Sequence, residues 1–86
     1  MLGASQSQAQ SIACGKHEAI VAALKSHYQE NRQAIGLAAT AGVVELYVSA
    51  AGTWTMIVTT PAGQTCIAAA GKAWQSMPQL KAETNT

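Results

Sequence analysis

The chain has 86 residues, which suits one small domain, and five basic and four acidic side chains give it a formal charge of +1. The basic residues are scattered, so the chain lacks the basic stripe of a nucleic-acid binder and the basic amphipathic helix of a membrane-surface protein. All four acidic residues are glutamates. The lack of aspartate excludes a Ser-His-Asp triad and an EF-hand loop.

Both ends of the chain predict disordered tails, at 1–11 and at 78–86, with one domain over 12–77 between them. Ser7 and Ala9 place small residues where a signal peptidase cleaves. We interpret residues 1–9 either as the end of a signal peptide whose front is absent from this chain or as an ordinary N-terminal tail. Since no apolar run reaches about 18 residues, we expect no membrane span.

Residues 17–31 predict a helix, because Ile20, Leu24 and Tyr28 recur every four residues and form one apolar stripe. Gly15 marks the expected start and Asn31 the expected end. Glu18 lies in the first turn, where the helix dipole favours an anion.

After the helix the apolar pattern changes to a period of two. We expect strands at 34–38, 43–49, 54–60 and 65–70, joined by turns at 40–42, 50–53 and 61–64. Short connections favour an antiparallel meander. The predicted fold is therefore a two-layer α+β domain, with one N-terminal helix on a sheet of three to four antiparallel strands.

The two faces of this sheet differ in polarity. We expect the helix to cover the more apolar face, which carries Val44, Leu46, Val48, Trp54, Met56 and Val58. The other face is semi-polar and is predicted to be a possible interaction surface, for a partner or a second copy of the chain. Its residues are Tyr47, Thr55, Ile57 and Thr59.

Cys14 and Cys66 predict a disulfide that ties the start of the helix to the last strand, worth about 4 kcal/mol in the chain-entropy model. Such a bond needs an oxidising compartment. Two other interpretations stay open, a zinc site that adds His17 and His27 and a catalytic thiol at Cys14 with His17 as base. The two histidines lie about 15 Å apart along one helix, which disfavours a shared metal. A pair of inert free thiols is the remaining possibility.

Other candidate chemistry is weak in the sequence. Glu30 and Glu45 are the candidates for a carboxylate pair, but we expect both to be solvated at the surface. Trp54 opens a strand and is interpreted as a core or rim residue. No glycine-rich loop has the phosphate-binding or dinucleotide-binding pattern. We therefore expect no catalytic residues, no metal and no cofactor.

Two short motifs carry a family resemblance, Gly-Thr-Trp-Thr at 52–55 and Thr-Pro-x-Gly-x-x-Cys at 60–66. With Cys14, Tyr28-Gln-Glu30, Gly36-Leu37, Val44-Glu45-Leu46, Thr59 and Ala70–Trp74, they make the chain similar to a group of short exported proteins from marine and Rhodobacter-like proteobacteria. The resemblance covers about 60 residues. It implies export to the periplasm or beyond and a signal peptide followed directly by this domain, and it transfers no catalytic residue and no function.

These observations favour a periplasmic or secreted binding or interaction module without catalysis, which takes a protein or a small ligand and has no nucleic-acid partner. One alternative is a thiol- or zinc-assisted hydrolase that uses Cys14 and His17. The other is a structural, self-associating protein.

Overall fold

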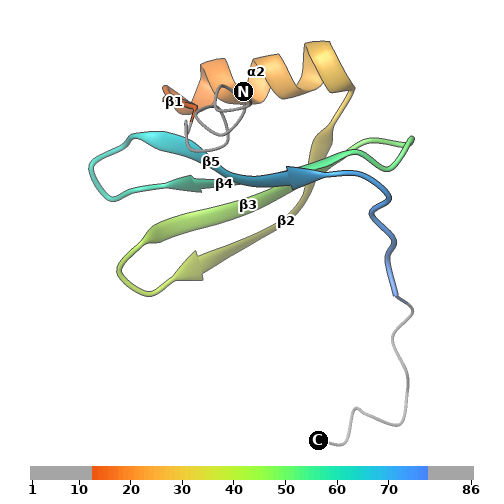
Figure 1. Ribbon diagram of the computed structural model, residues 1–86. Helices are drawn as coiled ribbons and strands as arrows, with labels where there is room; N and C mark the ends of the chain where they lie inside the picture. Colours follow the sequence, from red (N-terminus) through yellow and green to blue (C-terminus); the bar gives the residue numbers. More distant parts are fainter. Residues whose placement is uncertain (1–12, 78–86) are drawn as a thin grey trace, which may run out of the picture.

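Helix α2 (His17–Tyr28) lies on one side of a five-stranded antiparallel sheet in the computed structural model, which describes residues 13–77 (Figure 1). The spatial order of the strands is β1-β5-β4-β3-β2. Their bounds are Cys14–Gly15 for β1, Asn31–Ala38 for β2, Gly42–Val48 for β3, Trp54–Thr59 for β4 and Thr65–Gly71 for β5. The predicted α+β fold is confirmed. The sheet has one strand more than expected, because β1 is too short to show an alternating apolar pattern in the sequence.

The predicted tails at 1–11 and 78–86, and with them the proposed signal-peptide remnant at 1–9, lie outside the described residues. The predicted domain at 12–77 is described from residue 13 onward.

The helix ends at Tyr28, three residues before the predicted end. Gln29 adopts a left-handed conformation with φ 55°, and its backbone N–H donates to the carbonyl oxygen of Lys25. This conformation closes a helix and is usually taken by glycine, so the glutamine gives no signal of it in the sequence. The early stop lets β2 begin at Asn31, earlier than expected.

Strands β2 to β5 form the predicted meander. Each pairs antiparallel with the next, and β1 pairs with β5 at the far edge. The tight turn between β2 and β3 requires glycine at position 42, where φ is 116° and a Cβ atom would collide with the carbonyl group of Thr59.

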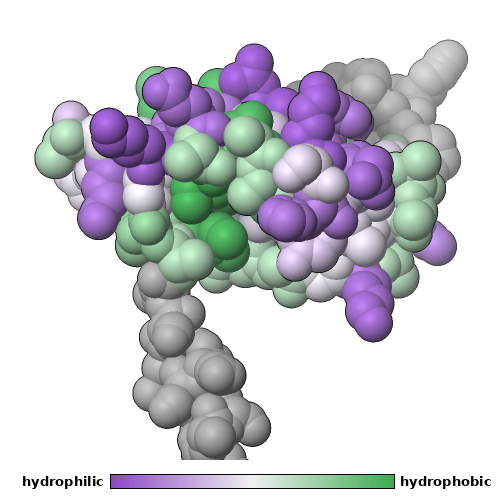
Figure 2. Space-filling view, turned by 90° about the horizontal axis from the view of Figure 1, so that it is seen from above, coloured by the Kyte–Doolittle hydropathy of each residue, from purple (hydrophilic) through white to green (hydrophobic). Residues whose placement is uncertain are grey.

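The helix covers the opposite sheet face from the one predicted. Leu24 of α2 packs against Tyr47 and Ile57, and these three residues form the buried core. Thr55 is buried and Thr59 is half-buried on the same face. Tyr47, Thr55, Ile57 and Thr59 therefore form no exposed interaction surface, which corrects the prediction. Figure 2 views the molecule from the helix side, where hydrophilic and hydrophobic groups are interspersed at the surface.

The covered face also carries a polar contact with α2. Glu45 lies on this face, and its carboxylate is buried and must find partners. Helix α2 supplies one of them, His17, at 2.8 Å. With the helix on the other face Glu45 would be hydrated, so this contact accompanies the choice of face and is not its cause.

The sheet face away from α2 carries the residues that were expected to form the core. Leu46 is buried there among its neighbours, while Val44, Val48, Met56 and Val58 are half-buried. No helix or strand within residues 13–77 covers this face, and only the segment after β5 descends beside it (Figure 1). Trp74 of that segment packs against Trp54 with ring centroids 5.5 Å apart and the ring planes tilted by 59°. We call this surface the open face.

Candidate functional site

Cys14 and Cys66 form a disulfide, as predicted. The two residues lie directly opposite each other in β1 and β5, so the bond joins the strand before α2 to the last strand of the sheet. Both thiols are consumed by the bond, and no described cysteine is free. The bond therefore removes the thiolates that the zinc and catalytic-thiol interpretations require.

The two histidines do not meet. His17 begins α2 and binds the Glu45 carboxylate, whereas His27 lies in the last turn of the helix. Within residues 13–77, no three histidine, cysteine or glutamate side chains gather closely enough to hold a metal ion.

Glu45 is the buried centre of a polar network on the helix side of the sheet, in which the side chains of His17 and Arg32 are about half exposed. Its Oε1 accepts a hydrogen bond from His17 at 2.8 Å, and its Oε2 accepts from Arg32 at 2.9 Å and from the Tyr47 hydroxyl at 3.2 Å. Burial by itself raises the pKa of the Glu45 carboxyl. The hydrogen bonds from Arg32 and His17 outweigh burial, so the pKa lies below its ordinary value.

The same network holds the Tyr47 phenol in its neutral form. Burial raises the pKa of Tyr47, and the adjacent negative charge of Glu45 raises it further. Both oxygens of Glu45 have partners on α2, β2 and β3, which fixes these elements relative to one another. We assign this network a structural role.

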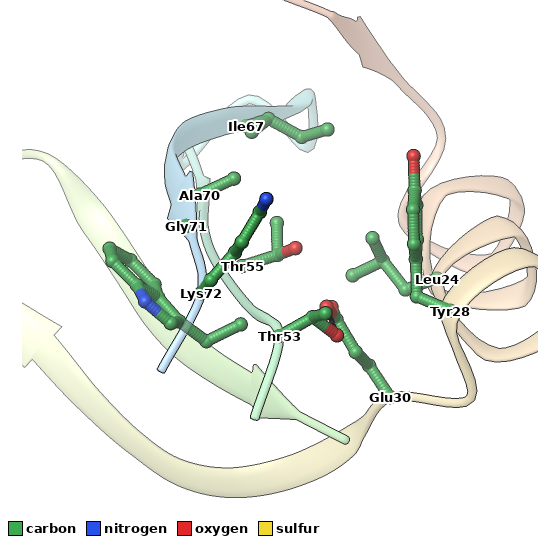
Figure 3. Close-up of a pocket in the computed structure, with 10 residues that line it drawn as sticks. Leu24, Tyr28, Glu30, Thr53, Thr55, Ile67, Ala70, Gly71 and Lys72 are labelled. Atoms are coloured by element: carbon green, nitrogen blue, oxygen red, sulfur yellow. Dashed lines mark hydrogen bonds between the residues drawn. The ribbon is translucent and has the colours of Figure 1, made fainter. Parts of the chain in front are cut away.

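A pocket of about 370 Å³ opens between the C-terminal half of α2 and the sheet end where β4 begins and β5 finishes. Its walls are mainly apolar. The lining residues are Leu24, Tyr28, Glu30, Thr53, Trp54, Thr55, Ile67, Ala70, Gly71 and Lys72 (Figure 3). Its volume falls in the range of small-molecule sites, and apolar walls with a few polar groups are typical of them.

The sequence of β5 explains why this space is not filled. Ile67 contributes a large side chain at one end, but residues 68–71 are three alanines and a glycine. On the other side, α2 stops at Tyr28, whose hydroxyl points away from Glu30 in Figure 3. Small side chains below and the end of the helix above leave the space between the two layers open.

Glu30 is the one carboxylate among the residues that line the pocket, and only 2% of its surface is exposed. Its Oε2 accepts a hydrogen bond from the Thr53 hydroxyl at 2.8 Å. Because Thr53 donates its single hydroxyl proton to Glu30, the Ser49 hydroxyl must donate to Thr53 across their 2.8 Å contact. The turn between β3 and β4 thus fixes the donor that orients Glu30.

The second oxygen of Glu30, Oε1, is buried and has no hydrogen-bond partner among the described residues. Buried polar atoms in folded proteins are nearly always hydrogen-bonded, and an unmatched carboxylate oxygen is costly. Figure 3 shows the carboxylate beside Thr53, in the space below Leu24 and Tyr28. Oε1 itself has almost no exposed surface, so a ligand in the pocket would supply the missing donor once neighbouring side chains move aside.

The expectation that Glu30 and Glu45 are solvated is wrong for both, since each is only 2% exposed. They do not pair with each other, because each has its own hydroxyl or basic partners. The alternation of β3 contains a signal for Glu45, which lies two residues from Tyr47 on the same face. Glu30 follows the helix in a connection, and no periodicity in the sequence indicates its burial.

Comparison with protein-family models, curated proteins and solved structures finds no match for the chain. The only helix within residues 13–77 has 12 residues, which is too short to cross a membrane.

Proposed function

We propose that this protein is a non-catalytic binding module that takes a small ligand in the pocket between α2 and the ends of β4 and β5. The observation that carries the proposal is the buried, unmatched Glu30 oxygen in a mainly apolar pocket of about 370 Å³. The apolar walls supply affinity by removing ligand surface from water, and the carboxylate supplies orientation.

We further propose that the protein works outside the cytoplasm. A disulfide persists in an oxidising compartment and is rare in the cytosol. The Cys14–Cys66 bond supports this placement, and so does the resemblance to exported proteins.

A fragment screen by NMR tests the binding function. We expect small aromatic or aliphatic fragments to shift the backbone amide signals of Thr53, Thr55 and Gly71, which line the pocket, and to leave that of Val44 unchanged. The variant Ala70→Leu fills the pocket and should abolish these shifts. Its control, Ala22→Leu, adds the same side chain to an exposed helix position. Shifts that are absent in the wild type, or that persist in the filled pocket, would contradict the proposal.

A second candidate function is self-association through the open face, with another copy of the chain as the partner. Two observations favour it. The open face is apolar and uncovered within residues 13–77, and β2 is an eight-residue strand at the edge of the sheet. Two open faces packed against each other, related by a two-fold axis, would remove their apolar side chains from water.

Sedimentation velocity over a range of protein concentrations tests this candidate. We expect a concentration-dependent increase in mass, which Met56→Lys should suppress by placing a charge in the open face. The control Ala22→Lys puts the same charge on the exposed side of α2. A monomer at every concentration would refute self-association.

A further inference from the structure

We propose that the pocket selects a primary ammonium group attached to a small apolar body, with Glu30 Oε1 as the acceptor for the ammonium. This inference rests on the proposed binding function and names its ligand class. Glu30 is only 2% exposed, and its Oε1 lacks a hydrogen-bond partner among the described residues. An anion offers no N–H donor to this acceptor, whereas an ammonium offers a donor whose charge complements a carboxylate.

The hydrogen bonds already made by Glu30 favour an ammonium over a guanidinium. A guanidinium binds best when both carboxylate oxygens accept in parallel. At Glu30, the Thr53 hydroxyl already binds Oε2, which leaves Oε1 as the single oxygen without a partner. A compact ammonium can donate to one oxygen and direct its remaining protons elsewhere.

Thr55 offers a second acceptor for the same group. Its side chain lines the pocket from β4 and is nearly buried. Its hydroxyl makes no side-chain hydrogen bond to the described residues, and in Figure 3 it points into the space between Lys72 and Leu24. The aliphatic side chains of Leu24 and Ile67 provide contact for the apolar body of the ligand.

Lys72 sets the charge balance at the mouth of the pocket. It is exposed, lines the pocket and has no carboxylate partner among the described residues. Its positive charge opposes the arrival of a cation, so Lys72→Gln should strengthen ammonium binding by about 2- to 5-fold, the range expected for an exposed charge.

The experiment compares three probes of the same shape by NMR titration, namely the phenethylammonium cation, neutral 2-phenylethanol and the 3-phenylpropionate anion. At neutral pH an alkylamine is protonated, because its pKa is near that of lysine, about 10.4. We expect phenethylammonium to bind most tightly and the anion not to bind. This order is measured on the wild-type protein and does not depend on the folding of any variant.

The matched variants are Glu30→Gln and Glu18→Gln. The glutamine carbonyl at position 30 can still accept from Thr53, so the fold should be kept, which a thermal melt verifies. We expect Glu30→Gln to weaken phenethylammonium binding by about 10-fold or more, the loss of a hydrogen bond to a charged group. Glu18 is exposed in the first turn of α2, and its replacement should leave binding unchanged.

Each other outcome decides a different point. Equal binding of phenethylammonium to the wild type and to Glu30→Gln overturns the ammonium assignment. Tighter binding of 2-phenylethanol, with shifts at Thr53 and Thr55, also overturns it but leaves the binding function intact. If none of the three probes binds, the ammonium assignment is wrong, and the fragment screen then decides separately whether the pocket binds ligands at all.

Discussion

Removing the Cys14–Cys66 disulfide should bring this domain close to unfolding. The bond joins residues 52 positions apart, and a closed loop of that size restricts the unfolded chain by about 4 kcal/mol in the chain-entropy model. Domains are stable by only about 5–15 kcal/mol, and small ones lie at the low end. In the fold Cys14 is exposed and Cys66 is half-buried. Replacing both by alanine therefore leaves little cavity, and the effect should come mainly from the unfolded state.

The assay is urea unfolding of the double variant Cys14→Ala/Cys66→Ala, followed by tryptophan fluorescence and by far-ultraviolet circular dichroism. With a denaturant slope of about 1 kcal/mol per molar, the midpoint should fall by about 4 M. The slope itself should rise, because an unfolded chain without the crosslink exposes more surface. Wild-type protein unfolded with a reductant should give the same midpoint as the variant, and the reductant should not change the variant.

A loss of stability below about 1 kcal/mol would refute this reasoning, because it would mean that the loop closed by the bond is already restricted in the unfolded chain. A large loss of stability with an unchanged denaturant slope would mean instead that the bond acts in the folded state, by anchoring β1 beside α2.

Three further predictions concern the core, the buried network and a turn. Ile57→Ala should cost about 2–5 kcal/mol in urea unfolding because Ile57 is fully buried, whereas Leu37→Ala at an 83% exposed position should change stability by less than about 0.5 kcal/mol. Glu45 has a lowered pKa in the fold, so its contribution is complete above the unfolded-state pKa of about 4.3 and is lost as pH falls through the lower folded-state pKa. Glu45→Gln should therefore weaken the fall of the urea midpoint at acid pH. The same fall in the variant and the wild type would contradict a stabilising role for the Glu45 network. Gly42→Ala should lower the melting temperature strongly, because its φ of 116° and the Thr59 carbonyl exclude a Cβ, whereas Gly36→Ala meets no atom within 4 Å and should not.

The sequence predicts secondary structure well where the period is strong. Strands β3 and β4 alternate with β-branched and aromatic residues, and the structure places them within one residue of the prediction. The sequence predicts the bounds of an element less well where the local conformation differs from the usual preference of the residue. The helix ends early because Gln29 takes a left-handed conformation, and β1 is held by pairing with β5 rather than by any pattern of its own.

The candidate pocket could not be predicted, because its parts are distant in the chain. Glu30 and Thr53 are 23 residues apart and meet only when the connection after α2 folds beside the turn after β3. Taken alone, each of these residue types is common in exposed loops. The pocket itself arises from the small residues at the end of β5, which read in sequence as a weak strand rather than as the wall of a site.

The sequence by itself determined the α+β class, the antiparallel meander and the disulfide, since these follow from periodicity, short turns and two cysteines. The tertiary structure alone decided which sheet face the helix covers. The less apolar face is the covered one, so counting apolar side chains along β3 and β4 does not decide the packing. On that face α2 packs Leu24 against the core and brings His17 to Glu45, so the expected core became the open face and the expected surface became the core.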